Sequence, residues 1–132
     1  MKRIVKIAAA AALLALAASC APKVAVTAHR GYWNCEEAGY AENSIKSLEL
    51  AQQNKLWGSE FDVHMTSDLV IVVHHDRDIK GVNIQTHDYA DFKDYRLKNG
   101  EKLPTLDEYL TQAEKGGTVL VFELKGQIDK AH

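Results

Sequence analysis

Residues 58–76, GSEFDVHMTSDLVIVVHHD, hold two apolar runs separated by a short polar stretch. Apolar and polar side chains alternate over 58–64, which is typical of a β-strand whose two faces have different surroundings. The run from Val70 to His74 is nearly all apolar, as in a strand that is buried on both faces. We therefore predict two strands here, and the acidic and histidine side chains in and after them are candidates for chemistry.

The segments on both sides extend an alternation of strands and helices, which indicates parallel βαβ units. Asn43 or Ser44 can cap the start of one helix, and Thr105 with Glu108 three residues later predicts a capping box at the start of another. Residues 77–100 are polar and irregular, and no element is predicted for them. The predicted elements are strands over 24–28, 58–64, 70–74 and 118–124, and helices over about 43–54 and about 105–114.

The first 19 residues have the pattern of a signal peptide. Three basic residues precede the apolar run Ile7–Ala18, which is too short to span a bilayer as a helix, since that takes about 20 residues. Small residues lead to Cys20, in a sequence similar to a bacterial lipobox. We predict cleavage before Cys20, lipid on that residue, and an exported protein that is anchored to the cell envelope, or else periplasmic or secreted.

Charge and cysteine content exclude several classes of protein. The 132 residues carry 16 Lys and Arg against 18 Asp and Glu, a formal net charge of −2, which excludes a nucleic-acid binder that works by bulk positive charge. That balance also excludes a disordered acidic or basic tail. Cys35 is the one cysteine besides Cys20, so a disulfide framework within the chain is not available.

Glu60 and Asp62 stand two residues apart in one predicted strand, so both carboxylates project from the same face. Carboxylates this close repel each other unless a cation or a proton lies between them. One interpretation is a solvated strand face, and the other is a site with oxygen ligands for Mg²⁺ or Ca²⁺. His64 shares this face, and we interpret it as a structural or supporting residue.

Charged and histidine side chains also follow three predicted strands. His29 and Arg30 follow the first strand, and His74, His75 and Asp76 follow the run over 70–74. Glu123 and Lys125 lie at the end of the last predicted strand. Ligands of parallel α/β folds bind at the carboxyl ends of the strands, so these side chains predict a site there.

Seven short motifs follow one another in the order His29-Arg30-Gly31, Glu42-Asn43-Ser44, Glu60-Phe61-Asp62-Val63, Thr66-Ser67-Asp68, His75-Asp76, Leu103-Pro104-Thr105-Leu106 and Phe122-Glu123-Leu124-Lys125. Together they resemble the glycerophosphodiester phosphodiesterase family over nearly all of residues 20–132. Ala41 departs from the family, which usually has proline at that position.

The resemblance implies a (β/α)₈ barrel of the TIM type that hydrolyses small-molecule glycerophosphodiesters to glycerol 3-phosphate and an alcohol. It implies roles for seven residues: His29 and His75 as the acid and base, Glu60, Asp62 and Glu123 as ligands of a divalent cation (Mg²⁺ or Ca²⁺), and Arg30 and Lys125 as phosphate-facing cations. We assign the second histidine to His75 and not to His74, because His75 directly precedes Asp76. The chemistry agrees, since an anionic phosphodiester needs its charge neutralised and two imidazoles can move the protons.

The chain is too short for a complete barrel of this type. A (β/α)₈ barrel has roughly 250 residues, whereas this chain has 132. We therefore expect residues 20–132 to be the N-terminal half of the barrel domain, from a fragment or a truncated product. Two alternatives stay open: a non-catalytic surface lipoprotein that binds a phosphorylated ligand, and a related two-histidine lyase or phospholipase.

Overall fold

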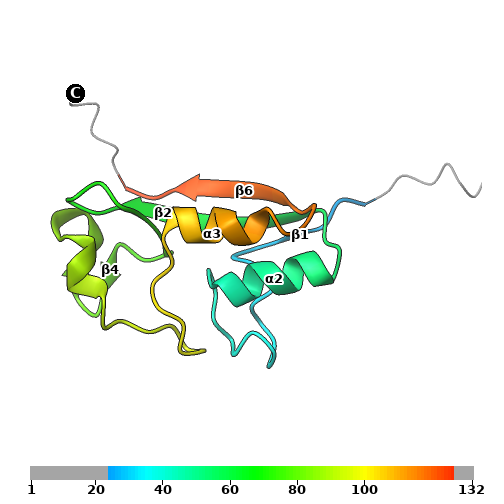
Figure 1. The fold of residues 1–132 in the computed structure, drawn as a ribbon, viewed down its shortest axis with the longest axis horizontal. Helices are drawn as coiled ribbons and strands as arrows, with labels where there is room; N and C mark the ends of the chain where they lie inside the picture. The colour runs from blue at the N-terminus through cyan, green and yellow to red at the C-terminus, as the bar shows by residue number, and fades with distance from the viewer. Residues whose placement is uncertain (1–23, 127–132) are drawn as a thin grey trace, which may run out of the picture.

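The computed structural model describes residues 24–126 (Figure 1), and the predicted signal peptide and Cys20 lie outside them. Among the described residues, no helix is both long and apolar enough to cross a membrane. The elements, in chain order, are β1 (Thr27–Ala28), α2 (Ile45–Gln53), β2 (Gly58–Met65), β3 (Ile71–Val73), β4 (Asp78–Ile79), β5 (Val82–Asn83), two 3₁₀ helices (Ile84–Thr86 and Tyr89–Phe92), α3 (Leu106–Ala113) and β6 (Val119–Leu124).

Strand β2 lies at the centre of the main sheet. Strand β6 pairs with it in parallel along one edge, with Asp62 opposite Glu123. The other edge is shared: β1 pairs in parallel with the start of β2, and β3 pairs antiparallel with its end. Between these two partners, the backbone N–H groups of Gly31 and His74 donate to the Glu60 and Asp62 carbonyls at 3.1 and 3.0 Å. The segments that follow β1 and β3 therefore both lie close to the middle of β2.

One predicted strand has the wrong orientation. The sequence pattern indicated parallel units throughout, but β3 returns antiparallel to β2 and is shorter than the predicted run over 70–74. The connection between the two strands is a tight turn closed by Thr66, whose Oγ1 accepts from Val70 N at 3.0 Å. A parallel pairing needs a crossover of a dozen or more residues, which this turn cannot provide. The first strand is also shorter than predicted, at Thr27–Ala28 instead of 24–28.

Both predicted helices are confirmed, together with their caps. The Ser44 side chain accepts from Ser47 N at the start of α2. The Thr105 and Glu108 side chains form the predicted capping box at the start of α3. The helices lie side by side (Figure 1), and they are joined by the Gln52 amide, which donates to the Gln112 carbonyl at 3.1 Å.

The helices cover the face of β2 that carries Phe61 and Val63. These two side chains are buried with Leu48, Val73 and Tyr109, and the Phe61 and Tyr109 rings stack at 4.5 Å between centroids. The opposite face of β2 is left to its polar residues. Successive side chains of a strand point to opposite faces, so the Glu60 and Asp62 carboxylates point away from the core.

Residues 77–100, which received no predicted element, fold around a second small core. Ile79, Ile84 and Phe92 are buried there against Val72 and Leu103. The segment contains the β4–β5 hairpin and both short 3₁₀ helices. Its apolar side chains are too irregularly spaced to give a helix or strand period, so the sequence pattern did not show this arrangement.

Strand β6 is the least covered part of the described fold. Phe122 and Leu124 are 61% and 54% exposed, and within residues 24–126 the far edge of β6 pairs with no strand. We expect the isolated 132-residue chain to bind the dye 8-anilinonaphthalene-1-sulfonate and to unfold without a sharp transition, because this surface is apolar. The double variant Phe122→Ser, Leu124→Thr should bind less dye. A monomer that unfolds cooperatively and binds no dye would contradict this prediction.

Candidate functional site

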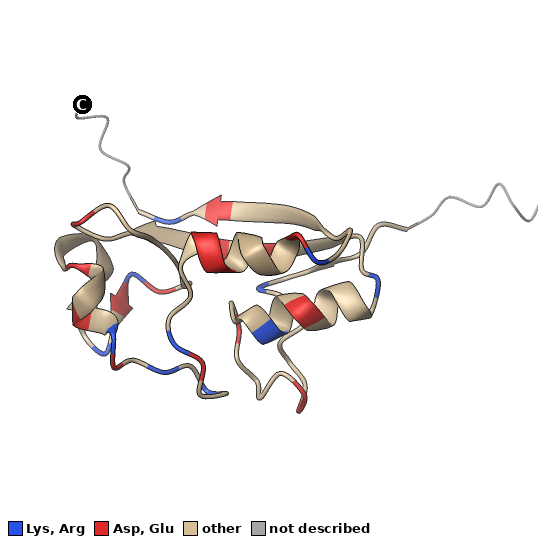
Figure 2. Cartoon of the chain, viewed as in Figure 1, with Lys and Arg blue, Asp and Glu red and all other residues tan. Residues whose placement is uncertain are grey.

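Three carboxylates meet at the carboxyl ends of β2 and β6. Glu60, Asp62 and Glu123 each offer an oxygen, and these three oxygens lie within 4.8 Å of one another. The parallel register places Asp62 opposite Glu123, and the period of two places Glu60 on the same face. The structure thus brings together the three carboxylates that the family resemblance implied as cation ligands. Acidic and basic segments lie next to each other at this end of β6 (Figure 2).

Asp62 is the most tightly held of the three carboxylates. It is fully buried, and its Oδ2 accepts from Asn43 Nδ2 at 2.9 Å while its backbone N–H donates to Asn43 Oδ1 at 3.2 Å. The Asn43 amide therefore holds Asp62 at two points and makes no hydrogen bond to Oδ1. Asn43 has a positive φ of 56°, a conformation that asparagine tolerates better than most residues.

Arg30 lies against all three acidic groups on its side of the site. Its backbone N–H donates to Glu60 Oε2 at 2.9 Å, its Nη1 donates to Glu42 Oε2 at 2.8 Å, and its Nε lies 3.6 Å from Asp62 Oδ2. Burial alone would lower the pKa of the guanidinium, but the hydrogen bond to Glu42 and the neighbouring carboxylates raise it above its usual value. Arg30 is therefore a fixed positive charge beside the acidic cluster.

The backbone after Arg30 turns sharply to bring this side chain back over the sheet. Arg30 and Gly31 both have positive φ, 59° and 80°. A side chain at Gly31 would collide with Ser47 of α2, so only glycine fits here. The Arg30 carbonyl accepts from Asn43 N at 2.9 Å, which joins the two turns that carry the site.

Lys125 supplies a second cation at the end of β6. Its Nζ lies 2.8 Å from Glu123 Oε1 and 3.3 Å from Asp62 Oδ1. The hydrogen bond to Glu123, opposed by a small desolvation, raises the pKa of the ammonium. Arg30 and Lys125 thus both pair with Asp62, so two cations lie beside the acidic cluster.

The two predicted acid–base histidines have different surroundings. His29 is 69% exposed at its side chain, with Nε2 3.9 Å from Glu60 Oε2. His75 Nδ1 bonds Asp76 Oδ1 at 2.7 Å, and its carbonyl is 3.1 Å from Nε2 of the buried His64. Within residues 24–126, no hydrogen bond or ion pair joins His29 to His75. His29 therefore lies beside Glu60, whereas the His75 ring is held by Asp76 and, within the described residues, has no hydrogen bond or ion pair to the three carboxylates.

His74 has different surroundings from His75. Its ring packs edge-on against Tyr95, with 5.9 Å between centroids, and burial lowers its pKa. An imidazole packed on an aromatic ring is typical of a structural group, and it is the His75 ring, not the His74 ring, that bonds a carboxylate.

Three residues at the site received no role from the sequence. Asn43 holds Asp62, Glu42 holds the Arg30 guanidinium, and Asp76 holds Nδ1 of His75. Glu42 and Asn43 stand together in one short motif and Asp76 in another, so the motifs contained the signal. Their partners, however, lie far away in the sequence and could be identified only in the folded chain.

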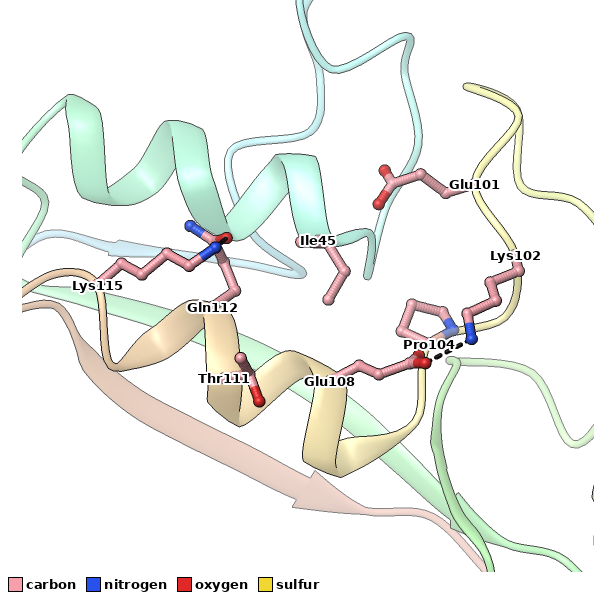
Figure 3. Close-up of a pocket in the computed structure, with 8 residues that line it drawn as sticks. All are labelled: Ile45, Glu101, Lys102, Pro104, Glu108, Thr111, Gln112 and Lys115. Carbon is pink, nitrogen blue, oxygen red and sulfur yellow. Dashed lines mark hydrogen bonds and ion pairs between the residues drawn. The ribbon is translucent and has the colours of Figure 1, made fainter.

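A groove between α2 and α3 lies apart from this site (Figure 3). It measures about 360 Å³ and has Ile45, Pro104 and Gln112 among its lining residues, and an ion pair joins Lys102 to Glu108 at its edge. None of the predicted site residues lines it. It has the character of a gap between packed helices, so the strand ends remain the candidate site.

The described residues form the first part of a (β/α)₈ barrel, with an acidic site at the carboxyl ends of its parallel strands. A family model described as "Glycerophosphoryl diester phosphodiesterase family" matches residues 29–127, and the chain belongs to that family.

Solved structures and characterised relatives agree with this membership. The crystal structure of a glycerophosphodiester phosphodiesterase from Parabacteroides distasonis has a TM-score of 0.72 and 55% identity, and covers 76% of this chain and 42% of that one. An Oleispira antarctica phosphodiesterase in complex with the product sn-glycerol-3-phosphate has a TM-score of 0.64 and 30% identity, over 77% of this chain and 44% of that one. Glycerophosphodiester phosphodiesterase 1 of Mus musculus is 28% identical over an alignment of 123 residues, which covers 83% of this chain and 36% of the mouse protein. The chain thus spans less than half the length of these relatives.

Proposed function

We propose that the complete protein hydrolyses glycerophosphodiesters to glycerol 3-phosphate and an alcohol. One observation carries the proposal: three converging carboxylates are flanked by the cations Arg30 and Lys125 at the strand ends. An arrangement of this kind suits a phosphodiester, which is anionic and gains charge on its oxygens as it reacts. Family membership and the glycerol phosphate bound to the Oleispira relative support the same substrate class.

The donor set fits a hard divalent cation such as Mg²⁺ or Ca²⁺. All three donors are carboxylate oxygens, which both ions prefer. Glu60 Oε1 and Asp62 Oδ1 are buried and accept no hydrogen bond in the described structure, although the Lys125 ammonium lies near Asp62 Oδ1. Buried carboxylate oxygens without a donor are costly unless a positive charge faces them. A cation held there would neutralise charge on the phosphoryl oxygens.

The protein's own residues would perform the remaining steps. Arg30 and Lys125 would bind the phosphate and hold the phosphorus between the two histidines. One imidazole would take the proton from the attacking hydroxyl or water as the new P–O bond forms, and the other would protonate the alkoxide as the old P–O bond breaks. The bond from His75 Nδ1 to Asp76 would fix the ring and leave Nε2 free to exchange the proton.

The test is release of glycerol 3-phosphate from glycerophosphocholine by the complete protein, with and without a chelator. We expect release that stops with the chelator and returns when Mg²⁺ or Ca²⁺ is added in excess. Tight binding of the diester with no product would instead identify a binding protein, and a cyclic phosphate as the final product would identify a lyase.

Asn43→Ala should weaken cation binding about 10- to 100-fold, the usual loss when a partner of a ligand is removed. Without the Asn43 amide, Asp62 Oδ2 loses its donor and the carboxylate can rotate away from Glu60 and Glu123. Calorimetric titration with Ca²⁺ measures the effect. Asn34→Ala, at an exposed position of the preceding loop, is the matched control and should bind normally. Equal affinity in both variants would contradict the positioning role of Asn43.

A further inference from the structure

A second hollow adjoins the site on the side away from β6. It measures about 240 Å³ and is lined by three aromatic side chains, Trp33, Tyr40 and Tyr95. Glu42 and Asp76 also line it, so aromatic rings and carboxylates surround the same space. We call these five residues the aromatic–acidic pocket.

This pocket is continuous with the groups that would bind and protonate the diester. Glu42 Oε2 accepts from Arg30 Nη1 at 2.8 Å, and Asp76 Oδ1 bonds His75 Nδ1 at 2.7 Å. Each carboxylate thus touches a site residue with one oxygen while its side chain also forms part of the pocket wall. A diester whose phosphate lies at Arg30 can therefore place one of its two arms in the pocket.

The charges in the pocket favour a cationic arm. The hydrogen bond from His75 lowers the pKa of Asp76, which keeps that carboxylate ionised. Burial and the nearby charges of Asp76 and Glu42 raise the pKa of Tyr95, so its phenol stays protonated. His74 also lines the pocket, and burial lowers the pKa of its imidazole.

Two cations oppose this preference. Lys98 also lines the pocket, and Arg30 pairs with Glu42 from the side of the site. Lys98 is exposed, so water screens its charge and its long side chain can point away. The pocket wall thus combines two carboxylates with aromatic rings, whose negative faces attract organic cations.

We propose that the aromatic–acidic pocket binds the alcohol arm of the substrate and selects a quaternary ammonium alcohol over a neutral one of the same shape. The inference rests on the proposed function and names the class of head group that this function would take. A quaternary ammonium has no N–H to donate, so aromatic faces and diffuse negative charge suit it better than a hydrogen-bonding site. A neutral polyol would gain from neither feature.

A binding experiment tests the pocket without any turnover. Trp33, Tyr40 and Tyr95 line the pocket, so a ligand that binds there contacts aromatic rings. Calorimetric titration of the complete protein compares choline with 3,3-dimethylbutan-1-ol, the neutral molecule of the same shape. We expect choline to bind about 5- to 30-fold more tightly, the range that a partly desolvated cation–π contact gives. Equal affinities, or tighter binding of glycerol than of choline, would overturn the proposal.

Substitution at Tyr40 tests the same pocket through specificity. Tyr40 is 50% exposed and outside both hydrophobic cores, so Tyr40→Leu should fold normally, which thermal unfolding checks. We expect its kcat/KM for glycerophosphocholine, relative to that for glycerophosphoglycerol, to fall at least about 5-fold. Tyr40→Phe keeps the ring and should keep the wild-type ratio. An unchanged ratio in Tyr40→Leu, or the same drop in Tyr40→Phe, would overturn the proposal.

The two experiments separate failure of this inference from failure of the proposed function. A protein that hydrolyses both diesters but binds choline no better than its neutral counterpart is a phosphodiesterase without this head-group pocket. A protein that binds choline selectively but hydrolyses neither diester has the pocket without the proposed activity. Lys98→Met gives an independent check, because removal of an opposing charge should tighten choline binding and leave the neutral alcohol unaffected.

Discussion

Glu60→Gln or Asp62→Asn is expected to abolish phosphodiester hydrolysis by the complete protein while leaving the fold intact. Each change keeps the size of the side chain and removes one negative charge from the three-carboxylate cluster. A hard cation loses most of its attraction to a site when a charged oxygen ligand becomes a neutral amide. At residue 62 the new amide oxygen can still accept from Asn43 Nδ2, so the contact that holds the strand remains.

Three measurements are needed for each variant: glycerol 3-phosphate release, calorimetric titration with Ca²⁺, and thermal unfolding. Glu49→Gln is the matched control, because it makes the same change of charge on α2, where the carboxylate pairs with Lys46. It should be active and bind the cation normally. Near-normal turnover by Glu60→Gln or Asp62→Asn without added metal would show that the carboxylates are not a metal site.

The parts of the site that were predictable are those set by local periodicity. Alternation along residues 58–64 places Glu60 and Asp62 on one face, and the apolar partners of that strand, Phe61 and Val63, pack on the other. The capping residues Ser44 and Thr105 also mark the two helix starts in the sequence, because a cap bonds within its own turn and needs no distant partner.

The parts that were not predictable depend on contacts between distant segments. Strand β3 has the apolar composition of a buried parallel strand, and only the short turn at Thr66 makes it antiparallel. Asn43 also has no periodic signal, because its role appears only when its turn meets β2, with Asp62 19 positions later in the chain. Composition describes how buried a segment is, whereas the partner of a polar side chain depends on the assembled fold.

His29→Ala and His75→Ala should each lower the turnover of the complete protein by roughly 10²- to 10⁴-fold, the usual contribution of a positioned acid or base. His29 lies beside Glu60, and the His75 ring is held by Asp76. Neither is a member of the acidic group, so affinity for Ca²⁺ should change little in either variant. Steady-state kinetics and calorimetric titration of the same preparations separate lost proton transfer from lost cation binding.

His74→Ala is the internal control, because it removes an imidazole one residue away from His75. The His74 ring packs against Tyr95 and lines the aromatic–acidic pocket, so its loss should affect stability and head-group preference more than turnover of a neutral diester. We therefore expect His74→Ala to lower turnover on glycerophosphoglycerol far less than His75→Ala does. A larger loss at His74 than at His75 would reverse the assignment and make His74 the proton-transferring residue. Equal and small losses at His29 and His75 would mean that proton transfer depends on other groups.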